Sequence, residues 1–294
     1  MVDVLLATYN GEKYLDEQLN SLINQTFKDI NIFISDDNST DKTINIIKRY
    51  MEIDPRIKLM VINKKKLGFV GNFEKLLKYS KADYLMLSDQ DDIWFLDKIE
   101  KMYKRMKEVE NNKQQPVLLH TNSMLMYKKM KTNKLFIDRI AMSNKFESFF
   151  FNYFVQGSTC MLNKKLKEEA LPFSKEVYLH DRYLHILAEL LGKRVFMNKA
   201  LTYYRQHEEN QIGASVNYIE KILKKTYYEE KDRDLIFYLN NKLKKRIEIK
   251  KMNSLKNYFI VTNKKITRLK RLYLILKYKI PIKVKKIIFL LLKG

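Results

Sequence analysis

The sequence contains few cysteines, glycines and prolines, and it has no long apolar run. Its 294 residues include one cysteine, seven glycines and four prolines. A single cysteine excludes an internal disulfide and a thiolate metal site, and it fits a reducing compartment. So few glycines and prolines argue against flexible linkers and low-complexity segments. No run reaches roughly 18 apolar residues, so we expect no membrane-spanning helix. The start, MVDVLLATYN, predicts no signal peptide.

Acidic residues are missing from the end of the chain. From residue 249 onward there are 14 Lys or Arg residues and no Asp or Glu, and residues 214–294 hold 23 basic and six acidic residues. We therefore predict a boundary near residue 213, with a basic, mainly helical tail over 214–294. Its last part, LKRLYLILKYKIPIKVKKIIFLLLKG, interleaves lysines with apolar residues. This pattern is typical of a segment lying on an anionic membrane surface, although a solvated helical bundle would have a similar composition.

The rest of the composition favours one large α/β domain over residues 1–213. Hydrophobic residues make up 46% and aromatic residues 12% of the chain, enough for a sizeable core. Short apolar runs alternate with segments of helical spacing, which predicts a mostly parallel sheet flanked by helices on both faces. The predicted strands cover residues 2–8, 30–37, 57–62, 82–89 and 116–126, with two short strands over 194–207. The later helices cover 96–110 and 180–193, and LGFVGN (67–72) is predicted to be a glycine-bearing turn.

Three of the predicted strands end in polar clusters. The clusters are Thr8-Tyr9-Asn10, Asp36-Asp37-Asn38 and Asp89-Gln90-Asp91-Asp92. In an open parallel sheet, ligands bind outside the carboxyl ends of the strands. We therefore expect these clusters to form one ligand site.

The stretch SDQDDIW (88–94) places three carboxylates within four positions of a strongly basic chain. One interpretation is a capping turn before the helix at 96–110, but a cap needs one acceptor rather than three. An Asp-x-Asp turn also presents hard oxygen ligands to Mg²⁺ or Mn²⁺, which shares its coordination shell with substrate phosphates. The sequence has neither a P-loop nor a Gly-x-Gly-x-x-Gly motif, so the metal would have to hold the phosphates.

Three further candidates each have a structural alternative. Asp37 is a typical helix-capping residue, but it could also accept a hydrogen bond from the imide N–H of a nucleobase. Asp181, after His180, begins a predicted helix, where the helix dipole favours a carboxylate; alternatively it faces the cleft as a general base. His207 lies close to Arg205, which suits a diphosphate or a metal, or else it lies in a surface loop. The four histidines are too scattered for a zinc cluster.

Taken together, these segments resemble the inverting glycosyltransferases of family 2, which have the GT-A fold. The sequences of these motifs are most similar to those of bacterial rhamnosyltransferase-like members that build surface polysaccharides. The resemblance covers about residues 2–212, and its matching pieces, in order, are LLATYNGEKYLDEQLNSLINQTF, ISDDNSTDKT, LGFVGNF, LSDQDDIW, QGSTCMLN, HDRYLHILAELLGK and YYRQH.

The resemblance implies a role for each candidate. Asp91 would ligate Mg²⁺ or Mn²⁺, and His207 would contact the metal or a phosphate. Asp181 would be the catalytic base that takes the proton of the acceptor hydroxyl. The contacts to the nucleotide sugar would come from Thr8, Tyr9, Asp37, Asn72 and Asp89, with Tyr9 and Asp37 at the base and Asp89 near the ribose.

These expectations describe a cytoplasmic enzyme that lies peripherally on the inner face of the cell membrane. It would move a sugar, rhamnose as the first choice, from a UDP- or dTDP-sugar to a glycan or lipid-linked glycan acceptor. A galactosyl- or glucosyltransferase of the same family is the nearest alternative. The net charge of +23 also suggests a nucleic-acid-binding protein. The chain has no recognisable reader motif for nucleic acid, so we expect no such partner.

Overall fold

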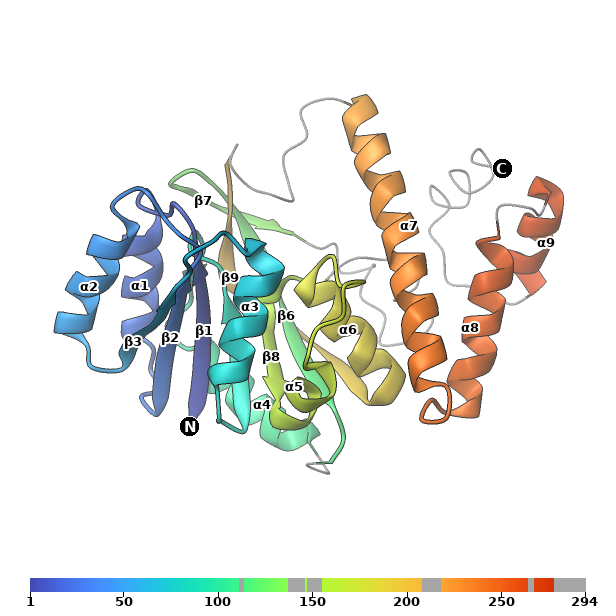
Figure 1. Cartoon of the computed structure of the whole chain (residues 1–294), viewed down its shortest axis with the longest axis horizontal. Helices are drawn as coiled ribbons and strands as arrows, with labels where there is room; N and C mark the ends of the chain where they lie inside the picture. The colour runs from blue at the N-terminus through green and yellow to red at the C-terminus, as the bar shows by residue number, and fades with distance from the viewer. Residues whose placement is uncertain (111–113, 137–145, 147–154, 208–217, 264–266, 278–294) are drawn as a thin grey trace.

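The computed structural model describes residues 1–110, 114–136, 146, 155–207, 218–263 and 267–277. The predicted domain boundary near residue 213 and the basic end from residue 278 lie outside these residues. So does FFFNYF (149–154), an aromatic run whose composition is typical of a core or of an acceptor-site wall. The described part of the chain forms a nine-stranded sheet with helices on both faces, and further helices lie beyond one end of it (Figure 1). The predicted α/β class is confirmed.

The first part of the chain alternates strands with helices, as the sequence predicts. Four of its strands run parallel to one another in the order β3-β2-β1-β4, so their carboxyl ends share one edge of the sheet. The elements are β1 (Val2–Thr8), α1 (Leu15–Ile23), β2 (Ile30–Asp36), α2 (Thr43–Ile53), β3 (Ile57–Ile62), α3 (Gly68–Tyr79) and β4 (Tyr84–Ser88).

Beyond β4 the sheet is mixed and continues in the order β8-β6-β9-β5. Strand β8 is antiparallel to both β4 and β6, β9 is parallel to β6, and β7 pairs with the far part of β6. These elements are β5 (Ile93–Trp94), α4 (Lys98–Val109), β6 (Val117–Tyr127), β7 (Met130–Leu135), η3 (Gly157–Thr159), β8 (Cys160–Asn163), α5 (Lys164–Ala170), α6 (His180–Leu191) and β9 (Lys193–Gln206).

Two predictions of local structure are wrong. Where two short strands are predicted over 194–207, the structure has a single 14-residue strand, β9 (Lys193–Gln206). Its pairing with β6 shifts register on both sides of Asn122, and such irregularities let a long strand bend without ending. Residues 68–72 start helix α3 rather than a turn, because the Asp37 carboxylate accepts hydrogen bonds from the N–H groups of Leu67 and Gly68.

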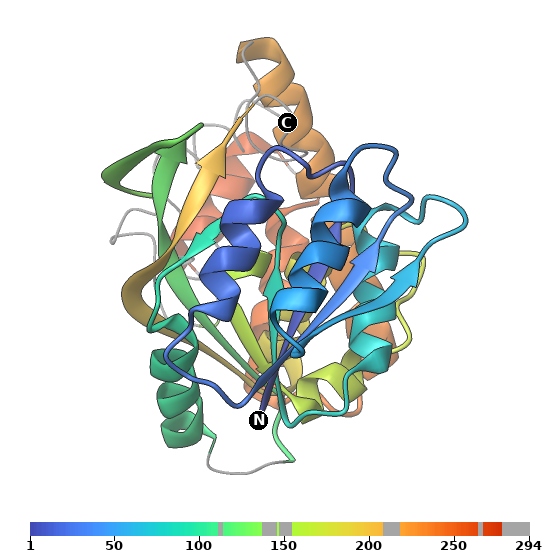
Figure 2. The same cartoon turned by 90° about the vertical axis from the view of Figure 1, so that its left-hand side faces the viewer.

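The core has two layers, one on each face of the sheet. In β1, Val2, Val4 and Leu6 belong to the layer under α1, α2 and α4, while Leu5 belongs to the opposite layer with α3, α5 and α6. This alternation follows from the two-residue period of a strand. Figure 2 shows α1 and α2 side by side in front of the sheet.

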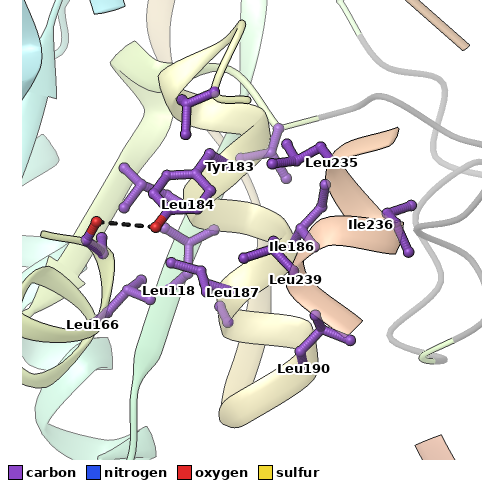
Figure 3. Close-up of a cluster of buried hydrophobic side chains, with 14 of the residues drawn as sticks. Leu118, Leu166, Tyr183, Leu184, Ile186, Leu187, Leu190, Leu235, Ile236 and Leu239 are labelled. Carbon is purple, nitrogen blue, oxygen red and sulfur yellow. Dashed lines mark hydrogen bonds between the residues drawn. The ribbon is translucent and has the colours of Figure 1, made fainter. Parts of the chain in front are cut away.

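The C-terminal helices cover α6. They are α7 (Tyr218–Leu243), α8 (Ile249–Val261) and α9 (Arg268–Lys277). Ten of the twelve α6 residues are buried, because the sheet lies on one side and α7 on the other (Figures 1 and 3). Leu187 lies among these contacts, with Leu118 of β6 on the sheet side and Leu239 on the α7 side. The predicted helical extension is confirmed over the described residues, but it packs tightly against the domain it follows.

Charged contacts strengthen this packing. The buried Arg182 guanidinium of α6 donates a hydrogen bond to Asp232 of α7 at 2.8 Å. Arg246, after α7, pairs with Glu169 of α5 through two bonds of 2.8 Å. No helix among the described residues is both long and apolar enough to cross a membrane.

Candidate active site

A cavity of about 590 Å³ opens at the carboxyl ends of β1, β2 and β4. Its wall is built by loops that follow these strands, by the start of α3 and by the start of α6. All eight site residues predicted from the sequence line it: Thr8, Tyr9, Asp37, Asn72, Asp89, Asp91, Asp181 and His207. Segments up to about 200 residues apart in the chain therefore meet in one space, as the strand-exit argument predicts.

The two neighbouring aspartates after β2 have different surroundings. Asp36 accepts a hydrogen bond from Thr8 Oγ1 at 2.7 Å and two more from Ser39, so it braces the exits of β1 and β2. Asp37 lines the cavity and is 2% exposed. Asp37 does not cap α2, the helix that follows it in the chain. Its carboxylate instead accepts from the N–H groups of Leu67 and Gly68 at the start of α3.

Asp37 still has capacity for a ligand. Its carboxylate accepts from Asn63 Nδ2 at 3.0 Å and from the backbone N–H groups of Leu67 and Gly68 at 2.7 and 2.8 Å. A carboxylate offers about four acceptor sites, so one more donor can bind. Nearby, Asn72 Nδ2 donates to the carbonyl oxygen of Ser35 at 2.9 Å, which fixes the amide in the cavity wall.

Asp91 and His207 meet in the cavity wall, where Asp91 Oδ2 lies 2.8 Å from His207 Nε2. The imidazole also packs against the ring of Tyr14, with ring centroids 4.8 Å apart. A carboxylate oxygen and an imidazole nitrogen fit a divalent cation that takes its other ligands from phosphate and water. Within the described residues, no three His, Cys, Asp or Glu side chains are close enough to form a metal cage by themselves. A metal here would need oxygen ligands from the substrate.

Lys98, which the sequence does not single out, lies close enough to the acidic turn to interact electrostatically with Asp92 and Asp89. This fully buried lysine donates to the Ser158 carbonyl oxygen at 2.5 Å and to Thr202 Oγ1 at 2.7 Å, and it lies 3.5 Å from the centroid of the Trp94 ring. Burial lowers the pKa of Lys98 well below its usual value, and the charges of Asp92 and Asp89 oppose this shift. The two carboxylates therefore favour the charged form of Lys98 against the effect of burial, which couples this lysine electrostatically to the acidic turn.

Burial raises the pKa values of the other two carboxylates of the turn, Asp92 and Asp89. Burial, and then the charge of Asp91, raise the pKa of Asp92 to about 7. Asp92 Oδ1 accepts from the backbone N–H of Arg205 at 3.2 Å, which ties the turn to β9. Burial, and then the charges of Asp92 and Asp91, raise the pKa of Asp89 well above its usual value. Such crowding costs free energy unless a cation compensates it.

Asp181 lies in the first turn of α6 and faces the same cavity. Its two carboxylate oxygens accept from the backbone N–H groups of Gly157 at 3.2 Å and Arg182 at 2.7 Å. Gly157 has to lack a side chain, because a Cβ there would lie 2.9 Å from His180 Nε2. The His180 ring stacks on Phe73, and burial lowers the pKa of His180. These contacts hold Asp181 in place without covering it.

The cavity also contains polar residues that the sequence reasoning missed. Lys13 and Lys66 line it, and the Lys66 ammonium lies 3.7 Å from the centroid of the Tyr9 ring. The sequence argument assigned the phosphates to a metal alone, whereas the structure adds two cationic side chains to the same wall. Gln90 lines the cavity as well. These residues lie in or beside loops, and no local pattern distinguishes them from ordinary surface residues.

Comparison with known proteins identifies the family. The model of the family described as Glycosyl transferase family 2 matches residues 3–168. The chain belongs to this family. It is 34% identical over 228 residues to a Shigella flexneri protein named dTDP-rhamnosyl transferase RfbG, covering 74% of this chain and 76% of that one. It is also 32% identical over 108 residues to the putative teichuronic acid biosynthesis glycosyltransferase TuaG of Bacillus subtilis, covering 37% and 42% of the two chains. The predicted glycosyltransferase activity is thus confirmed.

Solved structures confirm the GT-A fold of this family 2 member. The S. aureus TarS fragment 1–349 in complex with UDP-GlcNAc superimposes with a TM-score of 0.61 at 15% identity, covering 90% of this chain and 82% of TarS. The mannosyltransferase PcManGT of Pyrobaculum calidifontis in complex with GDP-Man and Mn²⁺ gives a TM-score of 0.54 at 13% identity, covering 87% and 78%. At such identities the likeness concerns the fold alone.

Proposed function

We propose that this glycosyltransferase is an inverting, metal-dependent enzyme that transfers rhamnose from a dTDP-sugar, or a related hexose from a UDP-sugar, to a glycan acceptor of a surface polysaccharide. The observation that carries the proposal is that one cavity contains both the Asp91–His207 pair and Asp181. The similarity to the S. flexneri dTDP-rhamnosyl transferase supports rhamnose as the sugar. The similarity to a teichuronic acid glycosyltransferase supports a surface polysaccharide as the product.

The donor would lie along the carboxyl edge of the sheet. In this arrangement Tyr9 stacks on the base and Asp37 accepts its imide N–H, since Asp37 has acceptor capacity left. Asp89 lies near the ribose, while Thr8 and Asn72 shape the wall. The Lys13 and Lys66 ammonium groups would lower the cost of bringing a diphosphate next to several carboxylates.

Asp91 and His207 would hold Mg²⁺ or Mn²⁺. When bound, such an ion acts as a Lewis acid and neutralises the charge that develops on the departing diphosphate. Without an ion, the imidazole of His207 lies within hydrogen-bonding distance of the Asp91 carboxylate. This contact keeps both ligands in the cavity wall and in reach of the same cation.

Asp181 would act as the general base. Its carboxylate takes the proton of the acceptor hydroxyl as that oxygen attacks the anomeric carbon of the donor sugar. The bond from this carbon to the diphosphate breaks while the new glycosidic bond forms, so the configuration inverts without a covalent enzyme intermediate. The N–H groups of Gly157 and Arg182 hold the carboxylate in one orientation.

A membrane surface is the proposed site of action. On α9, Leu269, Tyr273 and Leu276 recur at the spacing of one helix face and are 82%, 58% and 66% exposed. Lys270 and Lys277 belong to the same helix. An exposed apolar face accompanied by lysines suits the interface of an anionic membrane, and the acceptor would then be a lipid-linked glycan on the inner leaflet.

A donor panel tests this function. The purified chain is mixed with Mg²⁺ or Mn²⁺ and with dTDP-rhamnose, UDP-galactose or UDP-glucose, and the release of nucleoside diphosphate is followed with and without a lipid-linked glycan acceptor. We expect dTDP-rhamnose to give the highest kcat/KM, a chelator to stop the reaction, and NMR of the product to show inversion. A preference for UDP-galactose or UDP-glucose would reassign the sugar. Retention of configuration would refute the mechanism assigned to Asp181.

A further inference from the structure

Gln90 links two loops that lie 81 residues apart in the chain. It sits in the acidic turn between Asp89 and Asp91, but its side chain reaches the loop after β1. There Gln90 Oε1 accepts from the backbone N–H of Tyr9 at 2.8 Å, and Gln90 Nε2 donates to the Tyr9 carbonyl oxygen at 2.9 Å. An amide can make such a pair of bonds with one backbone residue only in a fixed plane, so the two loops are held at a defined separation.

Gly11 provides the space for this link. A Cβ at position 11 would lie 2.4 Å from Gln90 Oε1 and 2.7 Å from Gln90 Cδ, far inside van der Waals contact. The Gly11 N–H also donates to Thr43 Oγ1 at 2.7 Å, which fixes the loop from the other side. The loop after β1 is thus closely fitted around the Gln90 amide, and the amide is part of the cavity wall.

The two linked loops face different parts of one ligand. If the proposed function holds, Tyr9 contacts the nucleobase, while Asp89 and Asp91 lie at the ribose and the diphosphate. Two covalently joined parts of one ligand bind together favourably only when the distance between their subsites is one that the ligand can span without strain. We infer that Gln90 is a positioning residue that sets the distance between the nucleobase subsite and the diphosphate subsite, so that a nucleoside diphosphate occupies both at once.

In the free protein, a glutamine with a purely structural role would make hydrogen bonds like those of Gln90. Gln25 is such a glutamine and provides the control. The Gln25 side chain is buried and, like the half-buried side chain of Gln90, it binds backbone groups of a distant segment. Its Nε2 donates to the Phe95 carbonyl oxygen at 2.8 Å, and its Oε1 accepts from the Ile99 N–H at 3.1 Å. Gln25 does not line the cavity. Gln25→Ala therefore removes a comparable link that has no part in spacing the two subsites.

The test compares a whole ligand with its halves. Calorimetry with Mn²⁺ on full-length protein measures the binding of dTDP and of inorganic diphosphate, and NMR titration measures the binding of thymidine. For Gln90→Ala we expect the Kd of dTDP to rise about tenfold while those of the halves change less than about twofold, because only the advantage of joining them is lost. Gln25→Ala should leave all three constants unchanged. Gln90→Glu keeps the acceptor for the Tyr9 N–H but cannot donate to the Tyr9 carbonyl oxygen. This variant should also weaken the binding of dTDP.

The outcomes separate the inference from the function beneath it. Urea denaturation first establishes that each variant is folded, and if Gln90→Ala is not, Gln90→Glu decides. A folded variant that binds dTDP as tightly as the wild type overturns the inference alone. So does a variant in which the whole ligand and both halves weaken in parallel, since that is the effect of a general structural defect. Wild-type protein that binds neither dTDP nor UDP overturns the proposed function and this inference with it.

Discussion

Asp91 and Asp181 are the same type of residue, but their neighbours suit them to different tasks. Asp91 lies 2.8 Å from an imidazole nitrogen and belongs to a turn with two further carboxylates, an arrangement that favours a cation. Asp181 lies in the first turn of a helix and is held by two backbone N–H groups, next to His180, whose ring stacks on Phe73. Its carboxylate lines the same cavity as Asp91, at the start of α6 rather than in the acidic turn. Substitutions at the two positions should therefore separate donor binding from chemistry.

For Asp181→Asn we expect turnover to fall by about 10²–10⁴, because a general base typically contributes that much to the rate. Donor affinity should stay nearly unchanged, since the asparagine keeps the size of the side chain and one hydrogen-bond acceptor. Single-turnover transfer and donor titration on the same preparation measure both quantities. The matched control is Asp97→Asn, at a half-exposed aspartate that pairs with Lys101 on the surface of α4. Normal turnover in Asp181→Asn would remove this residue from the chemistry.

For Asp91→Ala we expect the opposite pattern. Transfer should be abolished, and the part of dTDP or UDP binding that depends on Mg²⁺ or Mn²⁺ should disappear, because one of two protein ligands is lost. Calorimetry with and without a chelator measures this part in the wild type, in Asp91→Ala and in Asp97→Ala. The fold should persist, since Asp91 lies at the cavity surface. If the chelator has no effect on wild-type binding, the metal role of Asp91 and His207 is refuted.

The positions of the site residues could be predicted from the sequence, but their supports could not. Polar clusters at strand ends identify a site because parallel strands bring their carboxyl ends to one edge. Their individual roles came from the family resemblance. Lys98 and Gln90 act through partners 104 and 81 residues away, and such contacts exist only in the folded chain. A lysine in an amphipathic helix and a glutamine in a turn look like surface residues in the sequence.

At the scale of elements, periodicity predicted the first half of the fold well. The strands and helices from β1 to β4 follow from alternating apolar patterns, and their predicted alternation along the chain and parallel direction are confirmed. Strand β9 was wrongly divided in two because a register irregularity in its pairing with β6 is not visible in one strand's sequence. The start of α3 was mistaken for a turn because its N–H groups are satisfied by Asp37, which lies about 30 residues earlier.

The stability of helix α6 depends on helix α7, which belongs to the segment that the sequence predicts to be a separate tail. For Asp232→Ala we expect the free energy of unfolding to drop by about 3–5 kcal/mol, because Arg182 stays buried without its anionic partner. Urea denaturation measures the change. Arg246→Ala is the matched control, since this pair also joins a C-terminal residue to the sheet domain, but the Arg246 side chain is 52% exposed. The Glu169 side chain is 11% exposed but keeps Lys165 as a second partner, so we expect Arg246→Ala to cost only about 0–1 kcal/mol. Equal losses in the two variants would contradict this account of α6.

The whole molecule concentrates negative charge at its cavity and positive charge in its C-terminal helices. The cavity is lined by six Asp or Glu residues, whereas the chain after residue 248 contains none. The basic helices also cover α6, so they serve the stability of the fold as well as any membrane contact. Cutting the chain near residue 213 would expose α6. A loss of membrane binding could then not be separated from a loss of stability. A test of membrane binding therefore has to keep the full chain and change only its surface.

The final prediction concerns the exposed face of α9. For the double variant Leu269→Gln/Leu276→Gln we expect binding to anionic vesicles to weaken by at least about tenfold. Both side chains are more than half exposed and would bury apolar area in the interface, where a leucine contributes about 1.5–3 kcal/mol. Vesicle flotation with and without anionic lipid measures binding, and wild-type binding should fall at high salt.

The matched control for α9 is Ile62→Gln. Ile62 is 48% exposed at the end of β3, at the opposite side of the molecule from α9 (Figure 1). This variant should bind vesicles like the wild type, because β3 lies far from the proposed contact on α9. Lys270→Gln/Lys277→Gln should weaken binding to anionic vesicles by about 1 kcal/mol for each lysine removed, with no change for neutral vesicles. If the full-length chain ignores anionic vesicles, the C-terminal helices are only a cover for α6, and the enzyme meets its acceptor without them.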